Sequence, residues 1–116
     1  MNNYPFKHLQ LYSKDKLVTD IFCNDGEIKM IKYDNRIGYQ WFIAEDWKLN
    51  EILDLLADRA IPPRRANIKE ILASFGMEKY DAIELLKHTH GLSTDDYFWL
   101  KFDDEDLEYE DIKIRD

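Results

Sequence analysis

Few residues in this chain could carry out chemistry, and their spacing argues against a reaction centre. The one cysteine, Cys23, lies in a predicted strand without a neighbouring cation, so we interpret it as a small core hydrophobe rather than a nucleophile. His88 and His90 are two residues apart on a predicted helix, where such side chains point about 200° apart and do not share a metal ion. With His8 as the only other histidine, the sequence predicts no metal site.

The acidic residues form the densest group of potential catalytic side chains, but their pattern is typical of a solvated surface. Seven of the nine residues from 103 to 111 are Asp or Glu. Catalytic carboxylates lie in partly desolvated clefts that separate their pKa values, and a continuous acidic run does not indicate such a cleft. The ligand spacing of a calcium-binding loop is missing, and no glycine-rich turn leads into a helix to hold a nucleotide phosphate. The sequence therefore predicts no enzyme and no cofactor.

The negative charge is concentrated at one end of the chain. The net charge is −8, and residues 95–116 contribute −7 of it through ten acidic and three basic side chains, which leaves −1 for residues 1–94. This balance opposes a nucleic-acid partner, because binding to a polyphosphate depends on Lys and Arg. The acidic segment is either a solvated face that keeps the protein soluble or a docking surface for a basic protein, and both interpretations stay open.

Two kinds of side chain are candidates for contact with a protein partner. A row of carboxylates would attract a basic surface, whereas exposed aromatic side chains would supply the apolar centre typical of interfaces. The candidate partner-binding residues are Asp103, Asp104, Glu105, Asp106, Glu108, Glu110, Asp111, Trp41 and Trp47, with Tyr39 as a further exposed aromatic.

Length and composition predict one small folded domain over residues 1–116. A chain of 116 residues with 45% apolar and 14% aromatic content can bury a core without disulfides or metal. The N-terminus lacks the pattern of a signal peptide, and no apolar run approaches the roughly 18 residues of a membrane span. A single cysteine cannot form an internal disulfide, so we expect a cytoplasmic protein.

Residues 1–43 are predicted to be mainly β structure. Alternation over 7–12 and apolar content over 17–23 and 28–33 indicate three strands, and Asp25-Gly26 predicts a tight hairpin turn between the last two. The short apolar segment 40–43 is a candidate for a further strand.

The middle of the chain, residues 45–91, is predicted to form three helices. The period changes at about Glu45, and Pro62-Pro63 ends the first helix. Asn67, with Glu70 three residues later, predicts a capping box at the start of the second helix, which Gly76 ends. A third helix is expected from about Glu78 to His90, with Gly91 after it.

The C-terminal acidic segment, residues 95–116, returns to alternation and is predicted to be strand-like. The predicted fold class is therefore α+β, with an N-terminal antiparallel hairpin or meander, three central helices and a strand-like acidic end. In the loop between the first two helices, Arg64-Arg65 is expected to pair with acids of that end or, as the alternative, to contact a partner.

Residues 61–112 contain four short motifs. They are Ile61-Pro62-Pro63-Arg64-Arg65-Ala66-Asn67-Ile68, Leu85-Leu86, the block from His90 to Lys101 (HGLSTDDYFWLK), and Leu107-Glu108-Tyr109-Glu110-Asp111-Ile112. The chain resembles, on these motifs, the N-terminal region that precedes the kinase domain in HipA-like proteins of Gram-positive bacteria. Tyr109 stands where that region usually has Trp, and the acidic loop is richer in carboxylates.

The resemblance implies a binding function rather than catalysis. HipA-like proteins are serine/threonine kinases of toxin–antitoxin systems whose catalytic residues lie in the kinase domain, and we expect this chain to end before that domain. The family includes small separate proteins, similar to this N-terminal region, that bind the kinase as antitoxins. We therefore expect a non-catalytic module that regulates or assembles with a HipA-like kinase.

A second hypothesis follows from the charge. A small acidic phage or mobile-element protein could inhibit a host defence nuclease, in the manner of an anti-CRISPR protein, by occupying its basic nucleic-acid groove. The row of carboxylates between Asp95 and Asp111 favours this alternative, because it can imitate the charge of a phosphate backbone.

Overall fold

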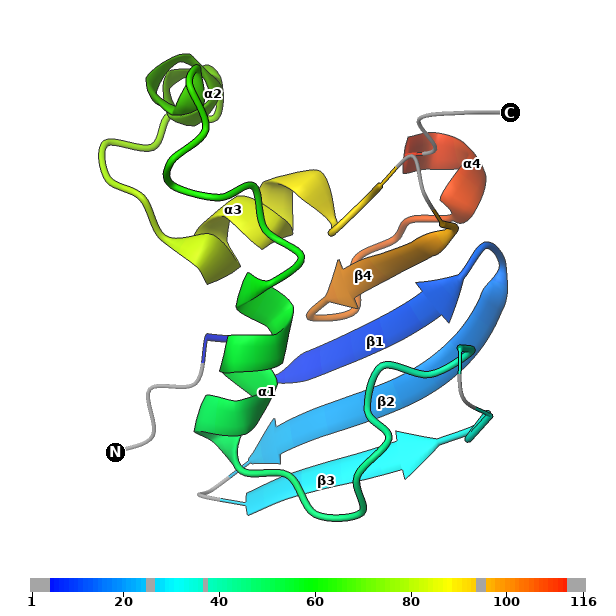
Figure 1. The fold of residues 1–116 in the computed structure, drawn as a ribbon. Coiled ribbons are helices and arrows are strands. Elements are labelled where there is room, and N and C mark those ends of the chain that lie inside the picture. Colours follow the sequence, from blue (N-terminus) through cyan, green and yellow to red (C-terminus); the bar gives the residue numbers. More distant parts are fainter. Residues whose placement is uncertain (1–4, 25–26, 37, 94–95, 113–116) are drawn as a thin grey trace.

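The fold is a four-stranded antiparallel sheet with helices on both faces. The computed structural model describes residues 5–24, 27–36, 38–93 and 96–112. The strands are β1 (His8–Ser13), β2 (Lys16–Asn24), β3 (Glu27–Lys32) and β4 (Phe98–Phe102), in the spatial order β3-β2-β1-β4. The helices are α1 (Leu49–Ala57), α2 (Ile68–Ser74), α3 (Ala82–Thr89) and α4 (Tyr109–Ile112). The predicted α+β class is thereby confirmed (Figure 1).

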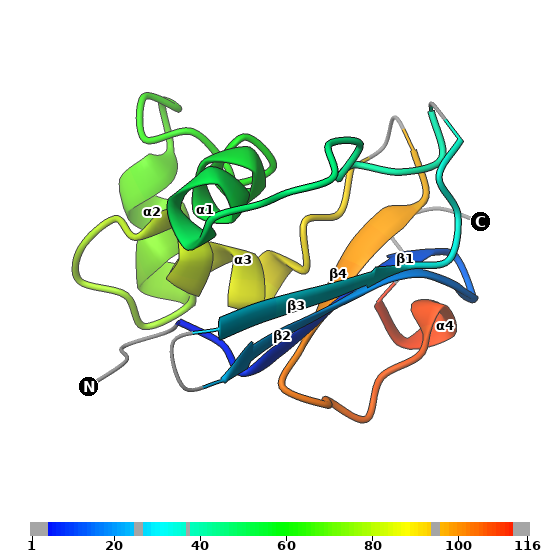
Figure 2. The same cartoon turned by 90° about the horizontal axis from the view of Figure 1, so that it is seen from below.

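The two faces of the sheet are covered differently. Figure 2 shows α1, α2 and α3 on one side of the sheet and the short α4 on the other. Strand side chains alternate between faces, so Leu9, Ile21 and Met30 share one face through their register. Leu9, Ile21 and their neighbours pack with Ile52 and Leu56 of α1 in the main core. On the other face, Trp99 is 1% exposed and stacks on Tyr12 at 4.8 Å between ring centroids.

The three predicted N-terminal strands are present, but the fourth is not. β1, β2 and β3 agree with the predicted ranges within one residue at each end, and the Asp25-Gly26 turn lies outside the described residues. The predicted strand at 40–43 was wrong. The Gln40 side chain ties this segment to the sheet without pairing, since its amide donates to the Asp34 carbonyl at 2.7 Å and its oxygen accepts from Thr19 at 2.7 Å. Phe42 then enters the core, where it is fully buried.

The helices are shorter than the periodicity predicted. α1 begins at Leu49 rather than at Glu45, and α3 begins at Ala82, where Asp81 accepts hydrogen bonds from two backbone N–H groups at 3.1 Å. Asn67 is the N-cap residue of α2, as predicted, but its side chain does not form the predicted capping hydrogen bond. The side-chain oxygen of Asn67 instead accepts from the Nε of Arg65 at 3.2 Å, in the turn before the helix.

The predicted strand-like C-terminal segment is only partly a strand. β4 forms where the sequence alternates over 97–102, and it pairs with β1, but residues 109–112 form α4 instead of a strand. The buried Tyr109 of α4 packs edge-on against Tyr97, with a ring-centroid distance of 6.2 Å. Residues 95 and 113–116 of the predicted segment lie outside the described residues.

The outer edge of β4 is covered by groups from the same chain. Because the N–H groups of a β-strand alternate in direction, those of Phe98, Leu100 and Phe102 point away from β1. They donate to a carboxylate oxygen of Asp96 at 3.1 Å, to the carbonyl of His90 at 2.8 Å and to a carboxylate oxygen of Glu105 at 2.9 Å, respectively. This edge is therefore closed to strand addition.

A left-handed turn at the end of α3 makes this cover possible. His90 and Gly91 both have positive φ, 58° and 67°, which reverses the chain after the helix and directs the His90 carbonyl at Leu100. A Cβ on Gly91 would lie 3.3 Å from Cδ1 of Leu100, a buried side chain.

Within the described residues, no helix is long and apolar enough to span a bilayer.

Replacing Gly91 should destabilise the protein more than replacing a glycine with room around it. We expect Gly91→Ala to lower the free energy of unfolding by about 2 kcal/mol, from left-handed strain plus crowding against Leu100. Gly76→Ala is the matched control, because Gly76 has φ 73° but nothing within 4 Å of the added Cβ, and it should lose only about 1 kcal/mol. Urea denaturation measures both, and equal losses would contradict the role given to the Leu100 contact.

Candidate protein-binding surface

The sheet has one edge that the described residues leave open, at β3. The N–H of Tyr33 donates to the Val18 carbonyl of β2 at 2.8 Å. Since direction alternates along a strand, the N–H groups of Ile28 and Met30 point outward from the sheet. Nothing in the described ranges bonds to these two groups. β3 thus offers outward donors for main-chain pairing, in contrast to β4.

The exposed large hydrophobic side chains lie on the segment that follows β3. In the part of the chain that the structure describes they are Tyr33, Tyr39 and Ile43, with 52%, 54% and 49% of their surface exposed. Tyr33 follows the last residue of β3 directly, and the carbonyl of Ile43 is 3.4 Å from the Nζ of Lys32. Figure 1 shows this segment running from β3 back to α1 in front of the sheet. We call Ile28, Met30, Tyr33, Tyr39 and Ile43 the β3-edge surface.

Three cations hold the segment in place at its ends. The Nζ of Lys32 donates to the carbonyls of Phe42 and Ala44, both at 3.0 Å. These carbonyls therefore have a hydrogen-bond donor although residues 40–43 do not form the predicted strand. The nearly buried Asp34 carboxylate accepts from Lys16 at 2.9 Å and from Arg36 at 2.7 Å. These bonds from Arg36 and Lys16 hold the pKa of Asp34 well below its ordinary value. The β3-edge surface is therefore preorganised, which lowers the entropic penalty of binding.

Arg36 also lies over the ring of Tyr39, with its guanidinium carbon 4.1 Å from the ring centroid. An exposed aromatic ring with a cation on one face leaves its other face for a partner.

The two tryptophans proposed from the sequence are half-buried, and Trp41 contacts β4 rather than β3. Trp41 packs against Phe98 at 5.4 Å between ring centroids, and the Arg59 guanidinium lies over its ring at 4.8 Å. Trp47 contacts Phe42 edge-on at 5.3 Å, and its indole N–H donates to the Ala44 carbonyl at 2.9 Å. Both rings contribute to holding the segment on the sheet.

Four of the proposed acidic residues are used inside the chain. Asp103 accepts from the backbone N–H of Lys7 at 2.6 Å and of His8 at 3.1 Å, and Asp104 contacts the His8 ring. Glu105 caps the edge of β4, and Asp111 accepts from the backbone N–H of Glu108 at 2.8 Å. These carboxylates stabilise turns of the fold.

The other proposed acids lie elsewhere. Asp106 is exposed and has no bond within the described ranges. Glu108 and Glu110 line an open cleft of about 500 Å³ with Tyr12, Asp15 and Lys101. The acidic segment lies along β4 and α4, at the opposite edge of the sheet from β3 (Figure 1). None of the tryptophan contacts in the described ranges involves one of these acids.

A network of four side chains links β1, β2, β3 and the turn after β4. His8 lies between two carboxylates, with Nε2 2.5 Å from Asp20 and Nδ1 2.5 Å from Asp104, and its ring stacks on Phe22 at 4.3 Å. The hydroxyl of Tyr33 donates to the second oxygen of Asp20 at 2.8 Å. Because both imidazole nitrogens face carboxylate oxygens, the arrangement fits a doubly protonated, positively charged His8.

The network shifts the pKa values of its members in opposite directions. Burial opposes the charged form of His8, but the hydrogen bonds to Asp20 and Asp104 outweigh it and raise its pKa above the ordinary 6.5. Burial likewise opposes the charged form of Asp20, but bonds from His8, Tyr33 and Gln10 hold its pKa below the ordinary 3.8. A base needs a free nitrogen, so this histidine is engaged in structure rather than poised for proton transfer.

The other side chains considered for chemistry are Cys23, His88 and His90. Cys23 is buried in the core, where burial and then the Asp103 charge raise the pKa of its thiol, so it is a core side chain. His88 is exposed and stacks on Phe75 at 4.7 Å, while Nδ1 of His90 is 3.0 Å from the Leu100 carbonyl. In the described ranges, no group of three His, Cys, Asp or Glu side chains could hold a metal ion.

The expected pairing of Arg64 and Arg65 with C-terminal acids was wrong for the described residues. Neither side chain has an ion pair there, and Arg59 takes that role by binding Asp96 through both terminal nitrogens at 2.9 and 3.0 Å. Arg59 lies in the turn that follows α1, whereas the two later arginines lie in the exposed turn before α2.

The β3-edge surface was only partly visible in the sequence. Alternation identified β3, but its position at the edge depends on β4 pairing with β1 at long range. Lys32, Asp34 and His8 were missed, because each acts through a partner that is remote in sequence. Comparison with known protein families, with curated proteins and with solved structures finds no match.

Protonation of His8 should make stability depend on pH above neutrality. Since the pKa is higher in the folded state than the unfolded 6.5, the stabilisation is fully present below pH 6.5 and is lost as pH rises through the folded-state pKa. We expect the urea midpoint of the wild type to fall between about pH 6 and about pH 9, and that of His8→Asn to stay nearly constant over this range.

His88→Asn is the control for this experiment, because His88 is exposed and has no carboxylate contact in the described ranges. It should keep the wild-type pH dependence. A similar slope in His8→Asn and the wild type would show that the carboxylate pair does not control the titration.

Proposed function

We propose that this chain is a non-catalytic protein-binding module that assembles with a HipA-like kinase and uses the β3-edge surface to do so. The observation that carries the proposal is the contrast between the two edges of one sheet. The three outward N–H groups of β4 are all paired within the chain, whereas those of Ile28 and Met30 in β3 have no partner in the described ranges. The exposed Tyr33, Tyr39 and Ile43 follow β3 in the sequence. Main-chain pairing with an extended segment of the partner would give affinity, and the apolar side chains would give specificity.

We name a HipA-like kinase as the partner because of the motifs between residues 61 and 112. The most specific of these motifs has a structural role in the fold. The block from His90 to Lys101 reverses the chain after α3, supplies β4 and covers its outer edge through His90 and Asp96. Such a task explains why the motif would recur with the fold of the HipA-like N-terminal region, independent of any catalytic role.

The alternative of an acidic inhibitor receives less support. Imitation of a phosphate backbone requires a row of carboxylates directed outward. Asp103, Asp104, Glu105 and Asp111 instead accept hydrogen bonds from groups of the same chain, which interrupts the row. We therefore place the recognition surface at β3.

The backbone of β3 gives a direct test. We expect Met30→Pro to weaken binding to a HipA-like kinase by at least about tenfold, because it removes one outward N–H without removing a β2–β3 bond. Met30→Ala is the matched control, since it removes the same partly buried side chain but keeps the N–H, and it should bind several-fold better than Met30→Pro. Isothermal titration calorimetry measures both, after circular dichroism confirms folding.

The side chains give a second test that does not depend on a backbone change. The double variant Tyr39→Ser, Ile43→Ser alters exposed residues only and should abolish binding, whereas Asp106→Asn, Glu108→Gln should leave the dissociation constant within about twofold. The opposite pattern, with binding lost on neutralising the acids and by raising the salt concentration, would favour the acidic surface. Full retention of binding by both Met30→Pro and the serine variant would refute the β3-edge surface.

A further inference from the structure

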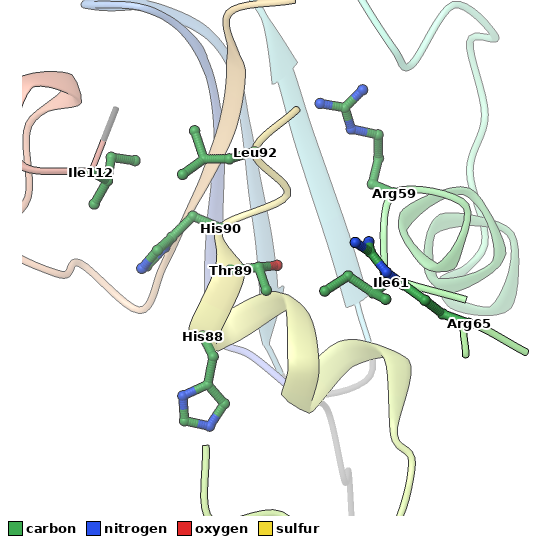
Figure 3. A pocket seen from close by; sticks show the side chains of 8 residues that line it. All are labelled: Arg59, Ile61, Arg65, His88, Thr89, His90, Leu92 and Ile112. Carbon is green, nitrogen blue, oxygen red and sulfur yellow. The ribbon is translucent and has the colours of Figure 1, made fainter. Parts of the chain in front are cut away.

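A cavity of about 490 Å³ lies where the helical layer meets the C-terminal segment, away from the β3 edge. It is lined by residues of the α1 end, the turn before α2, the last turn of α3, the loop after it and α4, namely Arg59, Ile61, Arg65, His88, Thr89, His90, Leu92 and Ile112. Figure 3 shows that Ile61 and the two arginines come from one side of this cavity, and Leu92, His90 and Ile112 from the other.

The charge of the lining is opposite to that of the chain. Four of its eight residues are Arg or His and none is acidic, although the chain has 24 acidic and 16 basic residues. An anion that enters would therefore meet no carboxylate in the wall. This composition suggests an anionic ligand with an apolar part that contacts Ile61, Leu92 and Ile112.

The two arginines differ in what their nitrogens already bind. Arg59 is occupied, since its terminal nitrogens donate to both oxygens of Asp96 and, at 2.7 Å, to the Gly91 carbonyl. Arg65 donates only through Nε, to Asn67 at 3.2 Å, and its two terminal nitrogens have no bond within the described ranges. A planar guanidinium with two such nitrogens binds two oxygens of a phosphate or carboxylate side by side.

A hydroxyl donor faces this guanidinium. Figure 3 shows the Arg65 guanidinium and the Thr89 hydroxyl directed toward one another across the cavity. The Thr89 oxygen accepts from the Gly91 N–H at 3.3 Å, so its proton is available to a ligand. The end of α3 is the negative end of the helix dipole, but the Leu86 and Thr89 carbonyls there are already bonded to His90 and Leu92 N–H groups, which weakens their effect on an anion.

We propose that this cavity binds a phosphate monoester with an apolar body. Arg65 would hold two phosphate oxygens and the Thr89 hydroxyl a third, while the body lies against Ile61, Leu92 and Ile112. A carboxylate has only two oxygens and would leave one of these donors unused, so the geometry favours phosphate. The proposal is independent of the β3-edge surface, because the cavity shares no lining residue with it.

The test is a titration of the ¹⁵N-labelled protein with phenyl phosphate, followed by amide chemical shifts. We expect saturable shifts at Thr89, Gly91 and Leu92, and dissociation constants raised at least about tenfold by Arg65→Gln and at least about threefold by Thr89→Val. Arg64→Gln is the matched control, since Arg64 is the exposed neighbour of Arg65 and does not line the cavity. It should bind as the wild type does.

Three further probes separate the parts of the ligand. Inorganic phosphate and the N-acetyl amide of phosphoserine carry the phosphate without an apolar ring and should bind several-fold more weakly than phenyl phosphate. Benzoate carries the ring with a two-oxygen anion and should also be weaker. Binding of benzoate as tight as that of phenyl phosphate, equal losses in Arg64→Gln and Arg65→Gln, or an absence of saturable shifts would each overturn the proposal.

Discussion

The outward N–H groups of β4 need hydrogen-bond partners, and the turn after α3 and the loops on either side of β4 supply them. Phe98, Leu100 and Phe102 lie at an edge of the sheet that the core partly buries, where an unpaired donor would destabilise the protein by about 1–3 kcal/mol. The left-handed end of α3 brings a carbonyl to this edge, and the loop carboxylate that pairs Phe98 is held by Arg59 from the turn after α1. This edge is thereby fixed to the helical layer, whereas the β3 edge has no such cover in the described residues.

Sequence reasoning succeeded where the apolar pattern decides structure and failed where single side-chain hydrogen bonds decide it. Alternation over 7–12, apolar content over 17–23 and 28–33 and the change of period at about Glu45 predicted β1, β2, β3 and α1, because each of these elements buries one face in the same core. Residues 40–43 have the apolar content of a strand, yet Gln40 and Lys32 satisfy their polar groups without pairing. Asn67 has the position of a cap but binds Arg65, two residues before it.

The candidate surfaces show the same division. The row of carboxylates was plain in the sequence, but Asp103 and Asp104 bind Lys7 and His8, which are more than 90 residues away and could not be inferred from spacing. The open edge of β3 required knowledge of the strand order. Of the three aromatic residues expected to be exposed, Tyr39 is exposed, but Trp41 and Trp47 are half-buried.

The order of the strands also has a consequence for synthesis of the chain on the ribosome. β1, β2 and β3 are contiguous and can pair as soon as residue 32 has emerged, but β1 receives its second neighbour only with β4, nearly 90 residues after β1 begins. Until then the meander exposes two unpaired edges, and the later-covered one carries apolar residues such as Leu9 and Leu11. The nascent chain is thus most prone to aggregation before Phe102 has been added, a period in which a chaperone would act on β1 rather than on the helices.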